Sequence, residues 1–244
     1  MGTNQTIEIS PQHYARIGGV LYLVIIAIGI FSELFVRGKL IVPGNATATA
    51  SNIVAHELLW RTSIAVDFLM HVCDVPLMMI LYVLLKPVNK NLALLALLFN
   101  VVQTAVLVAN KMNLLTVLFV SGGAGGLTAF DPQQLHALAY LANHLHGYGF
   151  GVGLIFFGFE CLVTGYLLFN SGYMPKALGV LMAIAGVCYL TNSFAMLIAP
   201  AFANALGAAI LAPCFIAELS LCLWMLFKGV NLPVWRARTG VGEQ

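Results

Sequence analysis

Long apolar stretches with few charged residues are the feature of this sequence that most constrains its fold. An α-helix of about 20 apolar residues is long enough to cross the hydrocarbon core of a bilayer. Hydrophobic residues make up 61% of the chain and charged residues 8%, whereas an average soluble domain is about 25% charged. We therefore predict an all-α fold, a polytopic transmembrane helical bundle in a single domain. Six spans are expected, at about residues 13–36, 54–85, 91–120, 134–170, 176–199 and 206–228.

Two of these helices have recognisable start signals. Ser10 supplies an N-cap and Pro11 a proline at the first helical position. Asp131 and Pro132 repeat this pair before the fourth span, and Gln134 completes a capping box.

The basic residues that flank the spans are unevenly divided between the two ends of the bundle. One end carries Arg37 and Lys39. The other end carries a larger group, Arg16, Lys86, Lys90, Lys176, Lys228, Arg236 and Arg238. Because Lys and Arg accumulate on the cytoplasmic side of membrane proteins, both termini are predicted to be cytoplasmic. The net charge of +2, without a basic cluster, argues against a nucleic-acid partner.

A first group of polar residues within the spans lies near the middle of the bilayer. Counting 1.5 Å per residue from the cytoplasmic helix ends places the group at a depth of ~15–22 Å. Its members are His71, Asp74, Asn100, Gln103, Glu160 and Glu218. Each ionised carboxyl at this depth costs about 2.5–3.5 kcal/mol, so we expect these side chains to face the bundle interior and some to hold a proton. A functional site and a structural hydrogen-bonded core are both compatible with this pattern.

A second group lies farther from the predicted cytoplasmic side. Its members are Glu33, Glu57, Arg61, Asp67, Asn110 and Lys111, with His146 at a similar depth. This layer mixes cations with anions, so we expect Arg61 and Lys111 to pair with some of Glu33, Glu57 and Asp67. Ion pairs that only fix the positions of helices are one reading of this group.

Small residues recur on one face of the fourth span, at Gly147, Gly151, Gly158 and Gly165. Gly179 and Gly186 repeat the spacing in the fifth span. This pattern predicts a seam where the two helices pack closely.

Motifs that would identify an enzyme class are absent from the sequence, including HExxH and GxSxG. We predict no cofactor and no metal site.

Several segments resemble the bacterial membrane family known as domain of unknown function 4386. They are IVPGNATATASNI (41–53), LLWRTSIAVDFL (58–69), LYVLLKPVNKNLALL (81–95), GYLLFNSGYMPKALGVLMAIAGVCYL (165–190) and LWMLFKGVN (223–231). The resemblance implies a multi-pass protein of the bacterial inner (plasma) membrane and no particular activity. It also implies that residues matching Arg61, Asp67 and Glu218 are typical of the family. Asn45 and Glu160 depart from the expected pattern, in which Asp and His stand at these positions.

Three functional hypotheses follow from the polar residues within the spans. The first is a site that binds or converts a small hydrophobic or lipid-like ligand, with a protonated Asp74, Glu160 or Glu218 as general acid. The second is a proton-coupled transporter or ion pathway. The third is a non-catalytic membrane subunit or stress protein whose polar residues only stabilise the bundle. The expected partners are membrane lipid, a small hydrophobic molecule and a second copy of the chain.

Overall fold

The computed structural model describes residues 10–121, 127 and 129–240. The described part is built from helices, connected by short turns. The helices are α1 (Pro11–Ile30), α2 (Gly38–Leu40), α3 (Ala46–Ala55), α4 (Glu57–Leu85), α5 (Lys90–Ser121), α6 (Pro132–Ser171), α7 (Lys176–Ile198), α8 (Pro200–Leu206), α9 (Ala212–Phe227) and α10 (Leu232–Thr239). A π-helical turn, Phe31–Arg37, joins α1 to α2, and a 3₁₀ turn, Gly207–Leu211, joins α8 to α9.

Within these described residues, six helical segments are long and apolar enough to cross a membrane. The all-α, six-span prediction is therefore confirmed. The segments are Pro11–Leu40, Glu57–Leu85, Lys90–Ser121, Pro132–Ser171, Lys176–Ile198 and Pro200–Phe227. The predicted caps also form: Ser10 accepts from the His13 backbone, and Asp131 and Gln134 make a complete capping box.

The distribution of exposed and buried side chains is typical of a protein embedded in a lipid bilayer. Apolar residues such as Ile198 and Phe227 are 81% and 70% exposed, whereas Asp67, Lys111 and Glu160 are buried. In a bilayer, exposed apolar side chains cost nothing, while unpaired polar groups facing the acyl chains are expensive. The chain is thus a multi-pass membrane protein.

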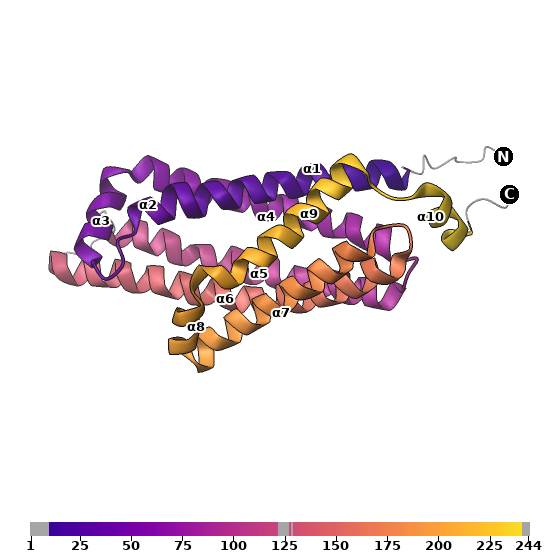
Figure 1. The fold of residues 1–244 in the computed structure, drawn as a ribbon. Helices are drawn as coiled ribbons and strands as arrows, with labels where there is room; N and C mark the ends of the chain where they lie inside the picture. The colour runs from indigo at the N-terminus through magenta and orange to yellow at the C-terminus, as the bar shows by residue number, and fades with distance from the viewer. Residues whose placement is uncertain (1–9, 122–126, 128, 241–244) are drawn as a thin grey trace.

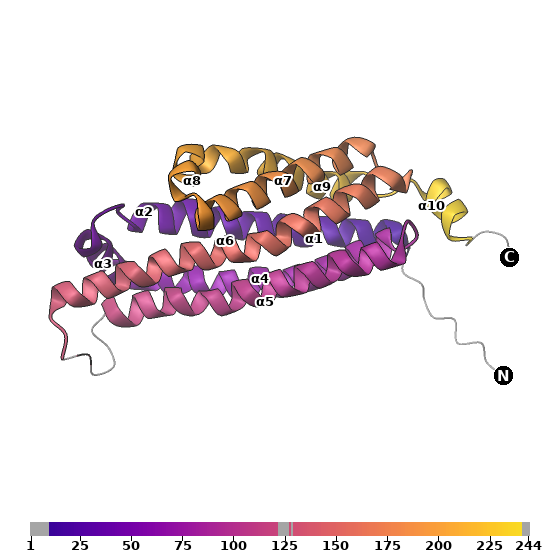
Figure 2. The ribbon, with the colours of Figure 1, turned by 90° about the horizontal axis from the view of Figure 1, so that it is seen from below.

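The start of α1 and helix α10 lie at one end of the bundle, and α3 lies at the other (Figure 1). Seen from the second direction, α4 and α5 form one side, α7 to α9 form the opposite side, and α1 and α6 run between them (Figure 2). The helices place Arg37 and Lys39 at the end of the bundle near α3, and the larger set of Lys and Arg residues at the end near α10 (Figure 1). Which side of the membrane holds the termini stays a prediction.

The first span continues farther than the sequence indicated. It was expected to end near residue 36, with Arg37 in the following loop. Instead, the π-helical turn carries the helix on to Leu40, and Arg37 is only 5% exposed. A π-helical turn widens the helix, and such turns are frequent at functional sites.

The glycine seam between α6 and α7 forms at four of the six predicted positions. A Cβ atom at Gly165 would lie 2.7 Å from the backbone oxygen of Gly179, and one at Gly158 would lie 3.1 Å from that of Gly186. Only glycine permits this approach. Gly151 instead faces the side chain of Met196, and Gly147 faces open space.

Helices α1 and α9 also touch through a glycine, near the end that carries the termini. A Cβ at Gly19 would lie 2.5 Å from the backbone nitrogen of Leu226. From this crossing point the two helices diverge toward the other end of the bundle (Figure 1).

Candidate functional site: an acidic cavity inside the bundle

A cavity of about 160 Å³ lies at the centre of the bundle, and side chains from all six spanning segments of the described chain line it. Most of the lining is apolar and aromatic, with Phe150, Phe157 and Leu221 as examples. The polar members come from α1, α4, α5, α6, α7 and α9, and are Tyr22, His71, Asp74, Gln103, Glu160, Tyr189 and Glu218.

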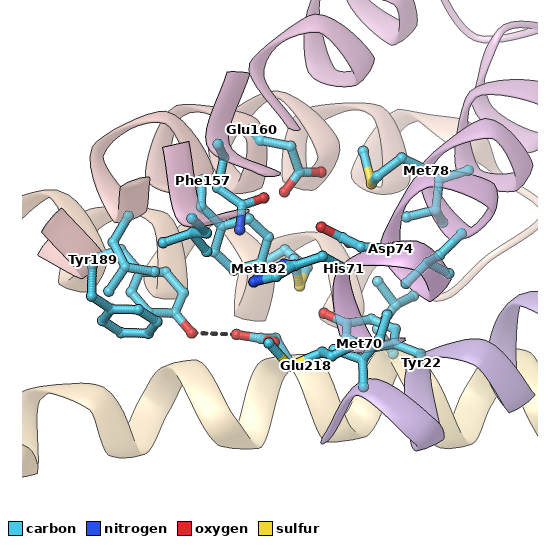
Figure 3. A pocket seen from close by; sticks show the side chains of 18 residues that line it. Tyr22, Met70, His71, Asp74, Met78, Phe157, Glu160, Met182, Tyr189 and Glu218 are labelled. Carbon is cyan, nitrogen blue, oxygen red and sulfur yellow. Dashed lines mark hydrogen bonds between the residues drawn. The ribbon is translucent and has the colours of Figure 1, made fainter. Parts of the chain in front are cut away.

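Three carboxyl groups from three different helices face this cavity. Figure 3 shows Asp74 on α4, Glu160 on α6 and Glu218 on α9 directed toward the same space. Glu160 is only 2% exposed, whereas Asp74 and Glu218 keep partial exposure. Within the described chain, no lysine or arginine lines the cavity.

Each carboxyl accepts a hydrogen bond from a neutral hydroxyl group. The Thr104 hydroxyl donates to Asp74 Oδ2 at 2.7 Å, and the Thr164 hydroxyl donates to Glu160 Oε1 at 2.6 Å. The Tyr189 hydroxyl donates to Glu218 Oε1, as the dashed line in Figure 3 marks. These donors orient the carboxyls without neutralising them, because a hydroxyl group brings no charge.

His71 brings to the cavity a buried ring nitrogen that lacks a hydrogen-bond partner in the described chain. It is 4% exposed, and its Nε2 atom has no hydrogen-bond partner among the described residues. Its ring lies among the carboxyls in Figure 3. A buried nitrogen without a protein partner is costly, so this atom needs a water molecule or another polar group in the cavity as its hydrogen-bond partner.

The amides predicted for this layer have different positions. Gln103 lines the cavity, whereas Asn100 is not among the lining residues and is 1% exposed. Asn100 Nδ2 donates to Gln103 Oε1 at 3.2 Å and approaches the carboxylate of Asp74 at 3.5 Å. Asn100 therefore supports the lining residues.

Sequence reasoning missed the hydroxyl donors and the aromatic residues of the cavity. A partial signal existed for the threonines, since Thr104 is four residues from Asn100 and Thr164 four residues from Glu160, on the same helix faces. No comparable signal exists for Tyr22 and Tyr189, because an aromatic residue in a span faces lipid as readily as protein.

A groove of about 310 Å³ adjoins the cavity where α1 and α9 diverge. Gly29, Ile30 and Leu34 from the first span and Leu211 and Phe215 from the last span line it. Groove and cavity share six lining residues, Ile25, Met70, Phe150, Leu154, Tyr189 and Glu218. The groove gives the cavity a largely apolar opening toward the side of the bundle.

The second predicted polar group contains a buried ionic network around Asp67. The Lys111 Nζ atom lies 2.8 Å from Asp67 Oδ2, and the Arg37 Nη1 atom lies 3.0 Å from the same oxygen. Arg37 also pairs with Glu33 at 2.8 Å. The pairing of Lys111 follows the prediction, but the second cation, Arg37, was expected outside the bundle.

The remaining members of the second group do not belong to this network. Arg61 pairs with Glu57 at 2.7 Å, as predicted, but both side chains are about half exposed near the start of α4. Asn110 binds His146 instead, donating to its backbone oxygen at 2.8 Å. Counting residues along the helices predicted a common depth for these side chains. They do not meet, because they lie on helix faces that point in different directions.

The stretch of chain that contains this geometry matches one known family. Residues 17–229 match the family described as Domain of unknown function (DUF4386). The chain belongs to the DUF4386 family. A relative from the archaeon Archaeoglobus fulgidus, named only as an uncharacterized protein, is 31% identical over 170 residues, which are 70% of this chain and 85% of the relative. No solved structure matches the chain significantly.

The DUF4386 match includes every residue that lines the cavity and excludes α10. It also includes Arg61, Asp67 and Glu218, which the resemblance treats as typical of DUF4386. The structure gives these three residues different surroundings: an exposed ion pair for Arg61, the buried network for Asp67 and the acidic cavity for Glu218.

Proposed function

We propose that this DUF4386 protein binds a small, mostly apolar ligand inside the membrane. The observation that carries the proposal is the central cavity with its three inward-facing carboxyls and its adjoining apolar groove. Binding sites for small molecules are typically apolar hollows with a few convergent polar groups. A ligand dissolved in the bilayer reaches this site laterally, through the groove between α1 and α9.

The volumes of the cavity and the groove indicate which part of the ligand each of them would hold. The cavity of about 160 Å³ has room for roughly five water molecules, at about 30 Å³ each. It accommodates a compact polar group, while the larger groove accommodates an apolar chain or ring. A carboxyl that holds a proton at this position could also act as a general acid on the bound group.

A substitution at Gly29 tests the proposal. Gly29 lines the groove, and a Cβ atom there would meet nothing within 4 Å, so Gly29→Leu fills the groove without disturbing the packing of helices. We expect the purified wild-type protein to retain a small apolar molecule, detected by mass spectrometry of an organic extract, and Gly29→Leu to retain at least tenfold less.

Gly147→Leu is the matched control, because Gly147 also faces open space but lies in a different hollow. It should retain as much ligand as the wild type. Equal retention by Gly29→Leu and the wild type would contradict access through the groove. If the wild-type extract contains only membrane lipid, in the amount found for an unrelated membrane protein, the proposal itself is contradicted.

A second candidate function is a proton pathway, and the position of His71 supports it. Asp67 precedes His71 by four residues and Asp74 follows it by three, so one face of α4 links the buried ionic network to the cavity. The unpartnered Nε2 atom can accept and pass on a proton. Proton flux into vesicles that contain the protein, lost in His71→Phe, would favour this function, and unchanged flux would exclude it.

Plasma-membrane location, association with lipid and self-association remain part of the proposal. If substitutions at the cavity change only the stability of the protein, the third hypothesis, a non-catalytic membrane subunit or stress protein, replaces it.

A further inference from the structure

We infer that the ligand of the cavity is an organic cation, an amphipathic amine or quaternary ammonium compound whose charged head lies among Asp74, Glu160 and Glu218. This inference rests on the proposed function and specifies its ligand class. It goes beyond that function because an apolar site alone would accept a neutral molecule equally well.

The balance of charge around the cavity is the first argument. Three carboxyls line it, and the described chain contributes no lysine or arginine to the lining, with His71 as its one titratable nitrogen base. The buried cations of the neighbouring network, Lys111 and Arg37, are both bound to Asp67. Any positive charge that compensates the carboxyls must therefore come from protons or from a ligand.

The spacing of the carboxyls is the second argument. Among the described residues, no three His, Cys, Asp or Glu side chains are placed to hold one metal ion. The carboxyls surround a hollow of about 160 Å³ and do not converge on a point. A cation as wide as a substituted ammonium group fits this arrangement, and a bare metal ion does not.

The aromatic lining is the third argument. Tyr22, Phe150, Phe157 and Tyr189 come from three helices, and the rings of Phe157 and Tyr189 lie 5.2 Å apart, centre to centre. Aromatic faces attract quaternary ammonium groups through the ring quadrupole, and more strongly where water is excluded. The groove beyond these rings is largely apolar, with Glu33 and Glu218 among its lining residues, and suits the hydrocarbon part of such a molecule.

The unpartnered nitrogen of His71 is an independent sign of a guest molecule. Its Nε2 atom is buried at the cavity and lacks a partner among the described residues. In one tautomer this atom accepts a hydrogen bond from a protonated amine, and in the other it donates to a carboxyl that the ligand has neutralised.

The test compares a cation with its neutral counterpart. The full chain is placed in phosphatidylcholine nanodiscs, and binding of radiolabelled hexyltrimethylammonium is measured against empty nanodiscs. The competitors are the unlabelled cation and 2,2-dimethyloctane, which replaces the charged nitrogen by carbon. We expect saturable binding of one cation per chain and at least tenfold weaker competition by the hydrocarbon.

Variants connect this binding to the carboxyls. The Asp74→Asn, Glu218→Gln double variant should bind the cation at least tenfold more weakly, and Glu57→Gln, in the exposed pair with Arg61, should bind it normally. Phe157→Leu keeps an apolar lining and provides a second route if the double variant does not fold. It should weaken binding of the cation and leave the competition by the hydrocarbon unchanged.

The outcomes separate the two proposals. Equal competition by the hydrocarbon, or unchanged binding by the double variant, would overturn the inference about charge while leaving a ligand site for neutral molecules. Displacement of the probe by millimolar sodium or magnesium would overturn it in favour of a metal ion. If the labelled cation does not bind above empty nanodiscs, the inference fails, and retention of a ligand by the wild type but not by Gly29→Leu then decides the proposed function separately.

Discussion

Asp67 joins two cations in the interior of a bundle that otherwise contains few charges. It is fully buried and accepts from both Lys111 and Arg37 through one oxygen atom. A buried ion pair is weak support for stability in itself, but loss of one partner leaves an uncompensated charge, which costs much more. The network is therefore best examined by removing its central anion.

We predict that Asp67→Asn lowers the free energy of unfolding by about 3–5 kcal/mol, because Lys111 then remains buried without an anion and Arg37 keeps only the half-exposed Glu33. Detergent-induced unfolding, followed by circular dichroism, measures this change. The matched control is Glu57→Gln, whose half-exposed pair with Arg61 should contribute no more than about 1 kcal/mol. Similar losses in the two variants would show that burial does not strengthen the network.

The same network shows what sequence reasoning can and cannot recover for single residues. Asp67 and Lys111 were placed in one layer because each is a charged residue inside an apolar run, and their pairing follows from charge alone. The burial of Arg37 was not predicted, because its side chain points into the bundle only as a result of the π-helical turn. No residue pattern in the sequence indicates this turn. The spacing of four residues between Glu33 and Arg37 was the available signal.

At the level of helices, the close contact of α6 and α7 depends on residues without side chains. A Cβ at Gly165 would approach the backbone of Gly179 and Ala183 at 2.7–2.8 Å, so the helices must separate to accept it. We predict that Gly165→Ala lowers the free energy of unfolding by about 1–3 kcal/mol, as overpacking does elsewhere.

Thermal unfolding in detergent measures this effect, with Gly147→Ala as the control on the same helix. A Cβ at Gly147 meets nothing within 4 Å, so this variant should unfold at the wild-type temperature or slightly above it. Equal behaviour of the two variants would show that the seam does not constrain the helices.

Helices were the most predictable part of this fold. Apolar runs and caps such as Ser10 and Asp131 located the spans to within a few residues at most ends. The largest error lies in the last span, which was expected from residue 206 and begins at Pro200. A short helix and a 3₁₀ turn precede α9 there, and their mixed Ala, Asn and Gly composition resembles that of a loop.

For the whole molecule, the position of the termini leads to a prediction about orientation. The first and last described helices, α1 and α10, begin and end at the end of the bundle that carries most of the basic residues (Figure 1). We predict that reporters fused to either terminus in a bacterial host report the cytoplasm, as the excess of Lys and Arg requires.

A fluorescent protein at each terminus should fluoresce, and alkaline phosphatase at the same positions should stay inactive. Active phosphatase at both termini would reverse the orientation, and activity at one terminus alone would contradict the arrangement of spans.

Counting residues from the helix ends correctly predicted five of the residues that line the cavity. Position along the sequence alone can therefore locate part of a site inside a membrane bundle. Counting succeeds because every span runs from one end of the bundle toward the other, so distance along the chain approximates distance across the bilayer. It fails for residues such as Arg61 and Asn110, because depth carries no information about which neighbour a helix face meets.

The crossing of α1 and α9 at Gly19 has a consequence for where a guest molecule can come from. The two helices touch at Gly19 and leave a groove between residues 25–34 and 211–218, farther from the start of α1. If the cavity binds a ligand as we propose, a solute in the leaflet on the side of α3 would reach the carboxyls by lateral diffusion. A solute in the other leaflet would first have to cross the bilayer, so the proposed site would draw its ligand from one half of the membrane.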